Sequence, residues 1–262
     1  MATLSLSLTL GCDGGQSGGI DPSATLLETA PAGAGENAVR DPVAPGSEAE
    51  KAILLCIPPR NDVRSTITVS GGNWGTWASC ASYCPAGSFA YGFSHKSELS
   101  QGAGDDSALN GIMLNCNDRN TGAWTANVTS STGAWGNWLG LAMCPNADSP
   151  MTQGNLQLEA SQGIGDDTSA NRLSGACRNG TALNPPSNTA FGTWRGWVSC
   201  PAGTAVCGMK TRVEGSQGVG DDTSLNGVQL ECCTLCPAGQ VACGNNGECL
   251  APSACPPPPV VR

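Results

Sequence analysis

Short stretches of alternating apolar and polar residues recur along the chain, at residues 112–116, 156–159, 209–214 and 228–232. A period of two places every second side chain on one face, so each stretch predicts a β-strand with one buried face. Long amphipathic stripes of helical period are absent. Gly 36 and Pro 18 make up 54 of 262 residues, which suits short strands joined by tight turns. The pattern predicts an all-β fold.

A ten-residue motif, E-x-S-Q-G-x-G-D-D-[ST], occurs three times, at residues 98–107, 159–168 and 214–223. Its first aspartates, at positions 105, 166 and 221, are 61 and 55 residues apart, which is long enough for a small four-stranded sheet per repeat. Each copy is followed by an asparagine, namely Asn110, Asn171 and Asn226. Since strands are predicted on both sides, we expect the motif to join two strands.

The carboxylates of the motif have several readings. The aspartates are Asp105, Asp106, Asp166, Asp167, Asp221 and Asp222. Aspartate side chains accept hydrogen bonds from nearby backbone amides in turns, and the glycines of the motif permit positive φ. A structural role in turns is therefore expected. Paired acids for glycoside chemistry are one alternative, but a single catalytic centre needs one copy of its acids, not three. Calcium is another, although the alternating D-x-D ligands of known loops are missing, and we expect no metal.

Upstream of each motif lies a W-x-x-W pair, formed by Trp74 and Trp77, Trp135 and Trp138, and Trp194 and Trp197. A tryptophan pair repeated once per sheet is more often part of core or inter-sheet packing. Alternatively, these rings stack on sugar faces. In that case they form candidate ligand-binding positions together with the motif glutamates Glu98, Glu159 and Glu214.

Fifteen cysteines in a 26.4 kDa chain indicate a disulfide framework in an oxidising compartment. Zinc is the alternative, but His95 is the only histidine and Cys233 to Cys236 the only pair at Cys-x-x-Cys spacing. In each repeat a cysteine before proline is followed by a second one 32, 33 or 32 residues later. Equal spacing predicts the bonds Cys84–Cys116, Cys144–Cys177 and Cys200–Cys232.

The elements G-x-W-G-x-W, C-P-x-G, G-F-x-x-K-x-E and Q-G-x-G-D-D-[ST]-x-L-N-G-I-x-L-x-C, carried by residues 72–116 and echoed twice, resemble the vitelline membrane outer layer protein I family. The resemblance covers about 180 residues. It implies a disulfide-rich β-prism, in which three four-stranded Greek-key sheets surround a pseudo-three-fold axis. Family members are extracellular, and the founding one is a structural component of an egg coat with a reported activity on chito-oligosaccharides.

The resemblance also implies a bond between Cys207 and Cys233. The family pattern uses eight cysteines, and fourteen remain after Cys12, so we expect Cys56–Cys80 as a clasp and two bridges among Cys236, Cys243, Cys249 and Cys255, with their pairing open. The chain departs from the family at residues 171–177, which are less apolar, and at His95 and Ser97, where apolar residues are usual. We expect the sheets to pack less well there, with His95 an ordinary strand residue.

The sequence divides into four parts. Residues 1–12 look like the end of a bacterial lipoprotein signal, with Cys12 as the candidate lipidated residue, although a basic leader is missing. Residues 13–51 have the Gly, Ala, Ser and Pro content of a flexible tether. Residues 52–234 form the predicted prism, and 235–262 a Cys-rich tail with a Pro-rich end.

The net charge of −9 argues against nucleic acid and against anionic membrane surfaces, so a lipid anchor is the one membrane link we expect. We therefore expect an extracellular or surface-tethered, non-enzymatic module without a cofactor, which binds glycans or matrix and envelope proteins. The alternative is a carbohydrate-active enzyme, such as a chito-oligosaccharide transglycosylase or hydrolase, which would need one asymmetric pair of carboxylates.

Overall fold

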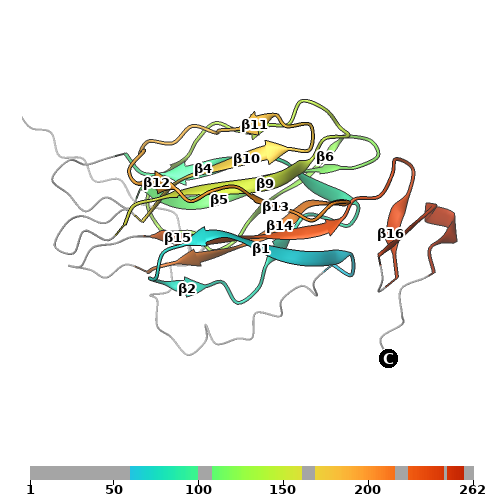
Figure 1. Cartoon of the computed structure of the whole chain (residues 1–262), viewed down its shortest axis with the longest axis horizontal. Helices are drawn as coiled ribbons and strands as arrows, with labels where there is room; N and C mark the ends of the chain where they lie inside the picture. Colours follow the sequence, from blue (N-terminus) through green and yellow to red (C-terminus); the bar gives the residue numbers. More distant parts are fainter. Residues whose placement is uncertain (1–59, 100–107, 161–168, 216–223, 245–246, 257–262) are drawn as a thin grey trace, which may run out of the picture. The chain divides into compact units, whose positions relative to one another are not determined.

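The computed structural model describes residues 60–99, 108–160, 169–215, 224–244 and 247–256, all within the second of two units, 1–50 and 51–262. The described residues form β-strands and one 3-10 turn, Pro252–Ala254, so the all-β prediction is confirmed (Figure 1). None of them forms a helix with the length and apolarity needed to cross a membrane. The motif aspartates, Cys12 and Cys56 lie outside the described residues.

Two of the three large sheets are formed by consecutive strands. Sheet B contains β4 (Ser88–Ser97), β5 (Leu109–Asp118), β6 (Trp124–Thr129), β7 (Asn137–Trp138) and β8 (Ala142–Met143). Sheet C contains β9 (Met151–Leu158), β10 (Ala170–Cys177), β11 (Ala182–Leu183), β12 (Thr193–Trp194) and β13 (Val198–Ser199). In sheet B the order is β6-β5-β4-β7, and β8 also pairs with β4, so two short strands share one edge. Each sheet therefore has four strand positions in Greek-key order, as expected.

Sheet A is assembled from both ends of the prism. It contains β1 (Val63–Gly71), β2 (Thr76–Trp77), β3 (Ser82–Tyr83), β14 (Thr204–Val213) and β15 (Leu225–Thr234). Its order, β1-β15-β14-β2 with β3 also on β14, reproduces that of sheets B and C. The sheets are therefore offset from the sequence repeats. The residues around the tryptophans of one repeat, which we call its tryptophan segment, contain short strands that pair with a long strand of a different repeat.

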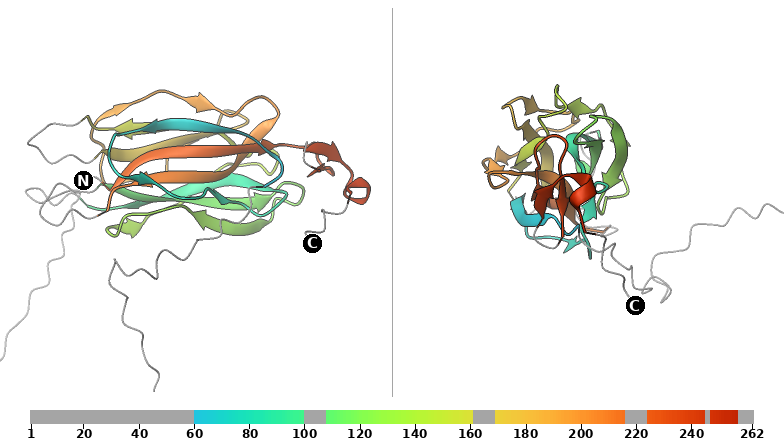
Figure 2. Two further views of the ribbon diagram at one scale, coloured as in Figure 1. Left: turned by 90° about the horizontal axis from the view of Figure 1, so that it is seen from below. Right: turned by 90° about the vertical axis from the view of Figure 1, so that its right-hand side faces the viewer.

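The three sheets enclose a common apolar core. The strands β4, β9 and β14 contact one another at its centre, and Figure 2 shows the sheets around them. Fully buried residues come from all three sheets, among them Phe93, Leu114, Leu156, Met209 and Leu230. The β-prism implied by the resemblance is confirmed.

Three disulfides join the sheets in a ring. Cys84 follows β3, and its amide donates a hydrogen bond to the Cys207 carbonyl of sheet A. Its sulfur, however, is bonded to Cys116 of sheet B. Likewise Cys144, beside β4 of sheet B, bonds Cys177 of sheet C. Cys200, beside β9 of sheet C, closes the ring on Cys232 of sheet A. These are the pairs that equal spacing predicted, and each crosses from one sheet to the next.

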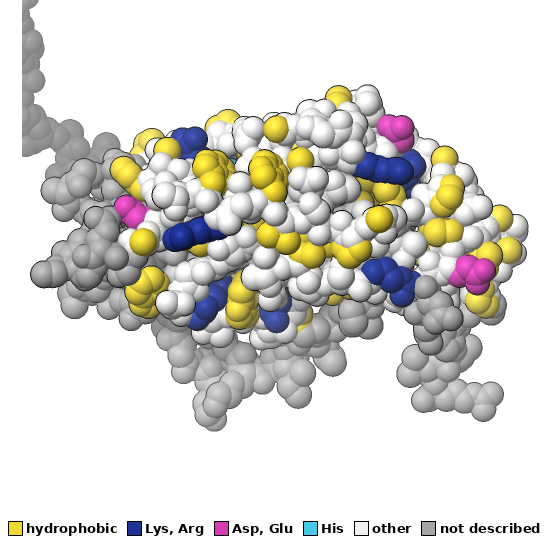
Figure 3. All heavy atoms as spheres, in the orientation of Figure 1, with side chains coloured by type: hydrophobic (Ala, Val, Ile, Leu, Met, Phe, Trp, Pro, Cys, Tyr) yellow, Lys and Arg dark blue, Asp and Glu magenta, His cyan; other side chains and the backbone are white. Residues whose placement is uncertain are grey.

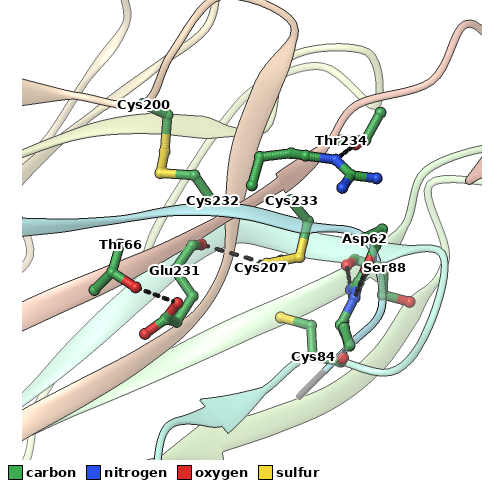
Figure 4. The surroundings of a disulfide bond; sticks show 12 residues. Asp62, Thr66, Cys84, Ser88, Cys200, Cys207, Glu231, Cys232, Cys233 and Thr234 are labelled. Carbon is green, nitrogen blue, oxygen red and sulfur yellow. Dashed lines mark hydrogen bonds and ion pairs between the residues drawn. A yellow bond between two sulfur atoms is a disulfide. The ribbon is translucent and has the colours of Figure 1, made fainter. Parts of the chain in front are cut away.

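Neighbouring cysteines on β15 bond in opposite directions. Figure 4 shows Cys232 reaching Cys200 and Cys233 reaching Cys207, as alternating side chains of a strand must. The bond Cys207–Cys233, which the resemblance implied, thus ties β14 to β15 within sheet A. Cys80 is also disulfide-bonded, while its expected partner Cys56 lies outside the described residues.

The tail contains a small hairpin, β16 (Val241–Cys243) with β17 (Glu248–Leu250), held by the bonds Cys236–Cys249 and Cys243–Cys255. This gives the pairing that the sequence left open. The hairpin contacts the prism, since the Gly239 amide donates to Asn120 Oδ1 at 2.8 Å. A cavity of about 420 Å³ between them is lined by Arg60, Phe89 and Gln240, among others. Arg60 is itself paired with Asp62 at 2.6 Å and lies over the Phe89 ring.

Candidate functional site

Each sheet carries a tryptophan on a short edge strand, namely β2, β7 or β12. The inner strand that pairs with it, β14, β4 or β9, is called the middle strand below. Trp77 lies opposite Arg212, Trp138 opposite Lys96, and Trp194 opposite Gln157. A glycine with positive φ precedes each of these strands, with φ of 76° at Gly75, 77° at Gly136 and 80° at Gly192. A Cβ at any of these glycines would lie within 2.4 Å of middle-strand backbone, so only glycine permits this approach.

This geometry corrects the W-x-x-W alignment of the third repeat. By strand pairing Trp194 is the equivalent of Trp77 and Trp138, so Phe191 takes the place of Trp74 and Trp135, and Trp197 is additional. The signal that was missed is the tripeptide Gly-[Thr/Asn]-Trp at residues 75–77, 136–138 and 192–194.

The tryptophans do not belong to the buried core, so of the expected core or inter-sheet packing the core role is wrong. Trp138, Trp194 and Trp197 are 41%, 45% and 49% exposed, Trp74 is 38% exposed, and Trp77 and Trp135 are partly buried. Trp77 packs on the outer side of sheet A, where a Cβ at Gly227 would lie 3.0 Å from its ring. The edge tryptophans therefore present ring surface to solvent.

The motif glutamates occupy equivalent places, one per sheet. The amides of Glu98, Glu159 and Glu214 each donate to the carbonyl just after the motif, at Ala108, Ser169 and Ser224 respectively. Along the chain, each glutamate lies two residues after the residue that is paired with the edge tryptophan. Each glutamate is partly buried and interacts with other residues. The structure thus brings glutamate and tryptophan to the same end of each sheet, without singling out one carboxylate.

A polar side chain of the middle strand holds the backbone of the tryptophan segment in place. In sheet A, Arg212 donates to the carbonyls of Gly72, Asn73 and Gly75. In sheet B, Lys96 Nζ donates to the carbonyls of Gly133 and Ala134 at 2.8 and 2.9 Å. In sheet C, the neutral Gln157 takes this role and donates to Ala190 and Gly192 at 2.9 and 3.2 Å.

Sheet C differs from the other two around Trp194. The chain leaves β11 at Pro185 and Pro186, which lack the amide needed to continue the strand, so β11 pairs only with Gly175 and Ala176 of β10. Beyond that point a hollow of about 310 Å³ opens between β10 and the proline segment. Its walls are formed by Arg172, Leu173, Asn184, Pro185, Pro186, Ser187 and Trp194.

His95 supports this hollow from inside. Its Nε2 accepts the Leu173 amide at 3.2 Å, and its Nδ1 lies 3.0 Å from the Pro186 carbonyl, to which it donates. Burial lowers the pKa of His95 to about 4, against the hydrogen bond to the Pro186 carbonyl that raises it, and the positive charge of Arg172 lowers it further. The ring is therefore neutral at pH 7. His95 and Ser97 are both buried and hydrogen-bonded, so the expected looser packing is not seen at them.

The described residues contain no group of three or more His, Cys, Asp or Glu side chains placed to hold a metal ion. The surface around the edge tryptophans carries exposed aromatic rings, amide and hydroxyl groups and single basic side chains. Figure 3 shows apolar side chains in small groups and basic side chains spaced apart among uncharged surface on one face of the molecule.

Three Greek-key sheets around one core, joined by disulfides and edged with exposed tryptophans, define a disulfide-closed β-prism protein. The chain belongs to the vitelline membrane outer layer protein I family, whose profile matches residues 65–235. It is 41% identical over 177 residues to the vitelline membrane outer layer protein 1 homolog of Homo sapiens, covering 66% of this chain and 85% of that protein. For the Mus musculus homolog the identity is 40% over 167 residues, covering 63% and 80%.

Among solved structures, Calystegia sepium agglutinin is similar with a TM-score of 0.44 and 10% identity, covering 66% of this chain and 97% of that one. The artocarpin–mannotriose complex gives 0.42 and 12%, covering 64% and 98%. Likenesses this distant carry no argument about function. The family profile begins at residue 65, so it gives no support to the bacterial lipoprotein context expected for residues 1–12.

Proposed function

We propose that this protein is an extracellular, non-enzymatic structural module that binds glycans through its edge tryptophans. One observation carries the proposal: Trp138 and Trp194 stand on equivalent edge strands with 41% and 45% of their surface exposed. Indole rings held open on a rigid sheet stack on the apolar faces of sugars. Membership of a family that the resemblance links to an egg coat supports the extracellular setting.

The repetition of the carboxylates supports binding over catalysis. Glu98, Glu159 and Glu214 have the same backbone hydrogen bond on three different sheets. Glycoside hydrolysis needs two carboxyl groups on either side of one bond, roughly 5 to 9.5 Å apart. An arrangement that gives each sheet one equivalent glutamate fits a scaffold role better than a single acid pair.

Glycan-array binding of the full chain, followed by titration of the best ligand, tests the proposal. We expect Trp138→Ala and Trp194→Ala to weaken binding. The matched control is Trp124→Ala, because Trp124 is 62% exposed but lies on β6, at the opposite edge of sheet B from Trp138. Equal losses for all three variants, or no binding to any glycan, would contradict the proposal.

We also propose that residues 13–51 tether the module and that Cys12 carries a lipid. The observation behind the lipid is the Leu-rich stretch ending at Gly11 and Cys12. Intact-mass measurement of the purified native protein tests it. An unmodified Cys12, or a mature chain starting elsewhere, would overturn it.

A further inference from the structure

In each sheet, three directly paired residues on neighbouring strands form a row across the sheet that ends at the edge tryptophan. Each row contains one basic side chain, but the strand that carries it differs between the sheets. The row in sheet A is Gly227, Arg212 and Trp77, and in sheet B it is Gly111, Lys96 and Trp138. In sheet C it is Arg172, Gln157 and Trp194. The cation has moved from the middle strand to the neighbouring β10.

This shift changes what the cation does. Lys96 and Arg212 are engaged by the carbonyls of the tryptophan segment, as described above. In sheet C that task falls to Gln157, so Arg172 is not needed for it. Among the described residues, the Arg172 side chain makes one hydrogen bond, from Nε to the Thr189 carbonyl at 2.7 Å. That bond orients the guanidinium of Arg172, which lines the hollow, and its two terminal nitrogens make no hydrogen bond to another described residue.

The shift also creates the space. In sheet A the Trp77 ring packs down on Gly227, and in sheet B the Thr132 side chain packs over Gly111. Arg172 takes the place of these glycines in sheet C, and the early end of β11 opens the hollow of about 310 Å³ between Arg172, Trp194 and the proline segment. Directly paired residues of a sheet share a face, so the cation and the indole flank Gln157 on one side.

We infer that this hollow is a binding site for an acidic saccharide. The sugar ring stacks on Trp194, and its carboxylate or sulfate accepts two hydrogen bonds from the terminal nitrogens of Arg172. Asn184 supplies further polar contact from the wall, and its Oδ1 is held by Ser174 Oγ at 2.6 Å. The inference deepens the proposed function and rests on it. With a net charge of −9, the protein has no general attraction for polyanions, so such binding depends on this one site.

The test is calorimetric titration of the full chain with tetragalacturonate, its methyl ester and a sulfated tetrasaccharide. We expect an acidic sugar to bind at least about tenfold more tightly than the uncharged ester, and Arg172→Gln to remove that preference. The tighter of the two acidic probes identifies the acid group. Arg178→Gln is the matched control, because Arg178 is an exposed arginine just after β10.

Arg172→Gly is the second variant, since it gives sheet C the residue of the other two sheets, and melting curves verify that the variants are folded. Equal binding of acid and ester by the unaltered protein overturns the inference without needing any variant. If neutral glycans then still bind through Trp138 or Trp194, the proposed function stands and the acidic site alone fails. If no saccharide of either kind binds, both fail.

Discussion

Ser224 Oγ donates to Asn110 Oδ1 at 2.7 Å, joining sheets A and B at two completely buried side chains. Ser169 Oγ does the same to Asn226 Oδ1 at 2.8 Å, joining sheets C and A. The third member of this ring is missing, because Ala108 stands where the serine would be. All three residues have positive φ, of 47° at Ala108 and 51° at Ser169 and Ser224.

The Ser224–Asn110 bond is expected to contribute to stability. Ser224→Ala leaves the Asn110 carbonyl oxygen buried without this donor, at a cost of about 1 to 3 kcal/mol in unfolding free energy. Ala108 shows that alanine occupies this backbone conformation, so the loss reports on the hydroxyl. Urea unfolding measures it, with Ser199→Ala on the exposed edge as control. A change no larger than that of the control would refute the assignment.

Ala108 and Thr189 are expected to be coupled. A Cβ at Gly133 would lie 1.9 Å from Ser224 Oγ, and one at Gly72 would lie 2.9 Å from Ser169 Oγ, so glycine accompanies serine there. Sheet C has Thr189 at the glycine position, opposite Ala108, and Thr189 Oγ1 is buried without a partner among the described residues. Ala108→Ser alone should therefore destabilise the fold by overpacking.

Adding Thr189→Gly should restore stability by making room for a third serine–asparagine bond, to Asn171. A double-mutant cycle in urea unfolding measures the coupling, which we expect to exceed about 0.5 kcal/mol. Strictly additive effects of the two changes would show that the two positions do not share this space.

Acid is expected to weaken the fold through His95. Its pKa is about 4 in the folded protein and 6.5 when unperturbed, so protons bind the unfolded chain first as the pH falls. Its contribution is complete above pH 6.5 and is lost progressively down to pH 4, a loss of roughly 3 kcal/mol at about 1.4 kcal/mol per unit. Arg172 is the charged group that opposes protonation.

Unfolding free energies measured between pH 4 and 7 check this, with His95→Gln as the comparison. The variant is expected to be less stable at pH 7 and to show a flatter pH profile over that range. If the two profiles are parallel, another group causes the acid sensitivity.

The ring of inter-sheet disulfides is expected to matter more to the prism than those of the tail. Replacing Cys84 and Cys116 by alanine opens a loop of 32 residues, which the chain-entropy model values at roughly 3 to 4 kcal/mol. Replacing Cys243 and Cys255 should leave the main thermal transition unchanged, because this bond lies within the tail. Calorimetry of both double variants gives the comparison, and similar shifts would show that tail and prism unfold together.

The strands could be predicted from the sequence because burial of only one face requires apolar and polar residues to alternate. Residues 209–214, which overlap β14, show this alternation. The assignment of strands to sheets could not, because a repeat can be divided at any phase without changing its alignment. The sequence alignment of Trp197 is wrong for a related reason. Its spacing from Trp194 is the same as in the other tryptophan pairs, whereas strand pairing makes Phe191 the equivalent of Trp74 and Trp135. Arg172 gives no signal until its neighbours across the sheet are known.

The assembly of sheet A from both ends of the prism bears on how the protein is made. Strand β1 emerges early in synthesis, yet its partner β15 ends at Thr234, so β1 lacks the strand with which it pairs until almost the whole domain has been synthesised. Contacts between residues so far apart in the chain form slowly and late. The prism thus cannot close before β15 has been synthesised, and Cys200 cannot form its native disulfide until its partner Cys232 on that strand has followed.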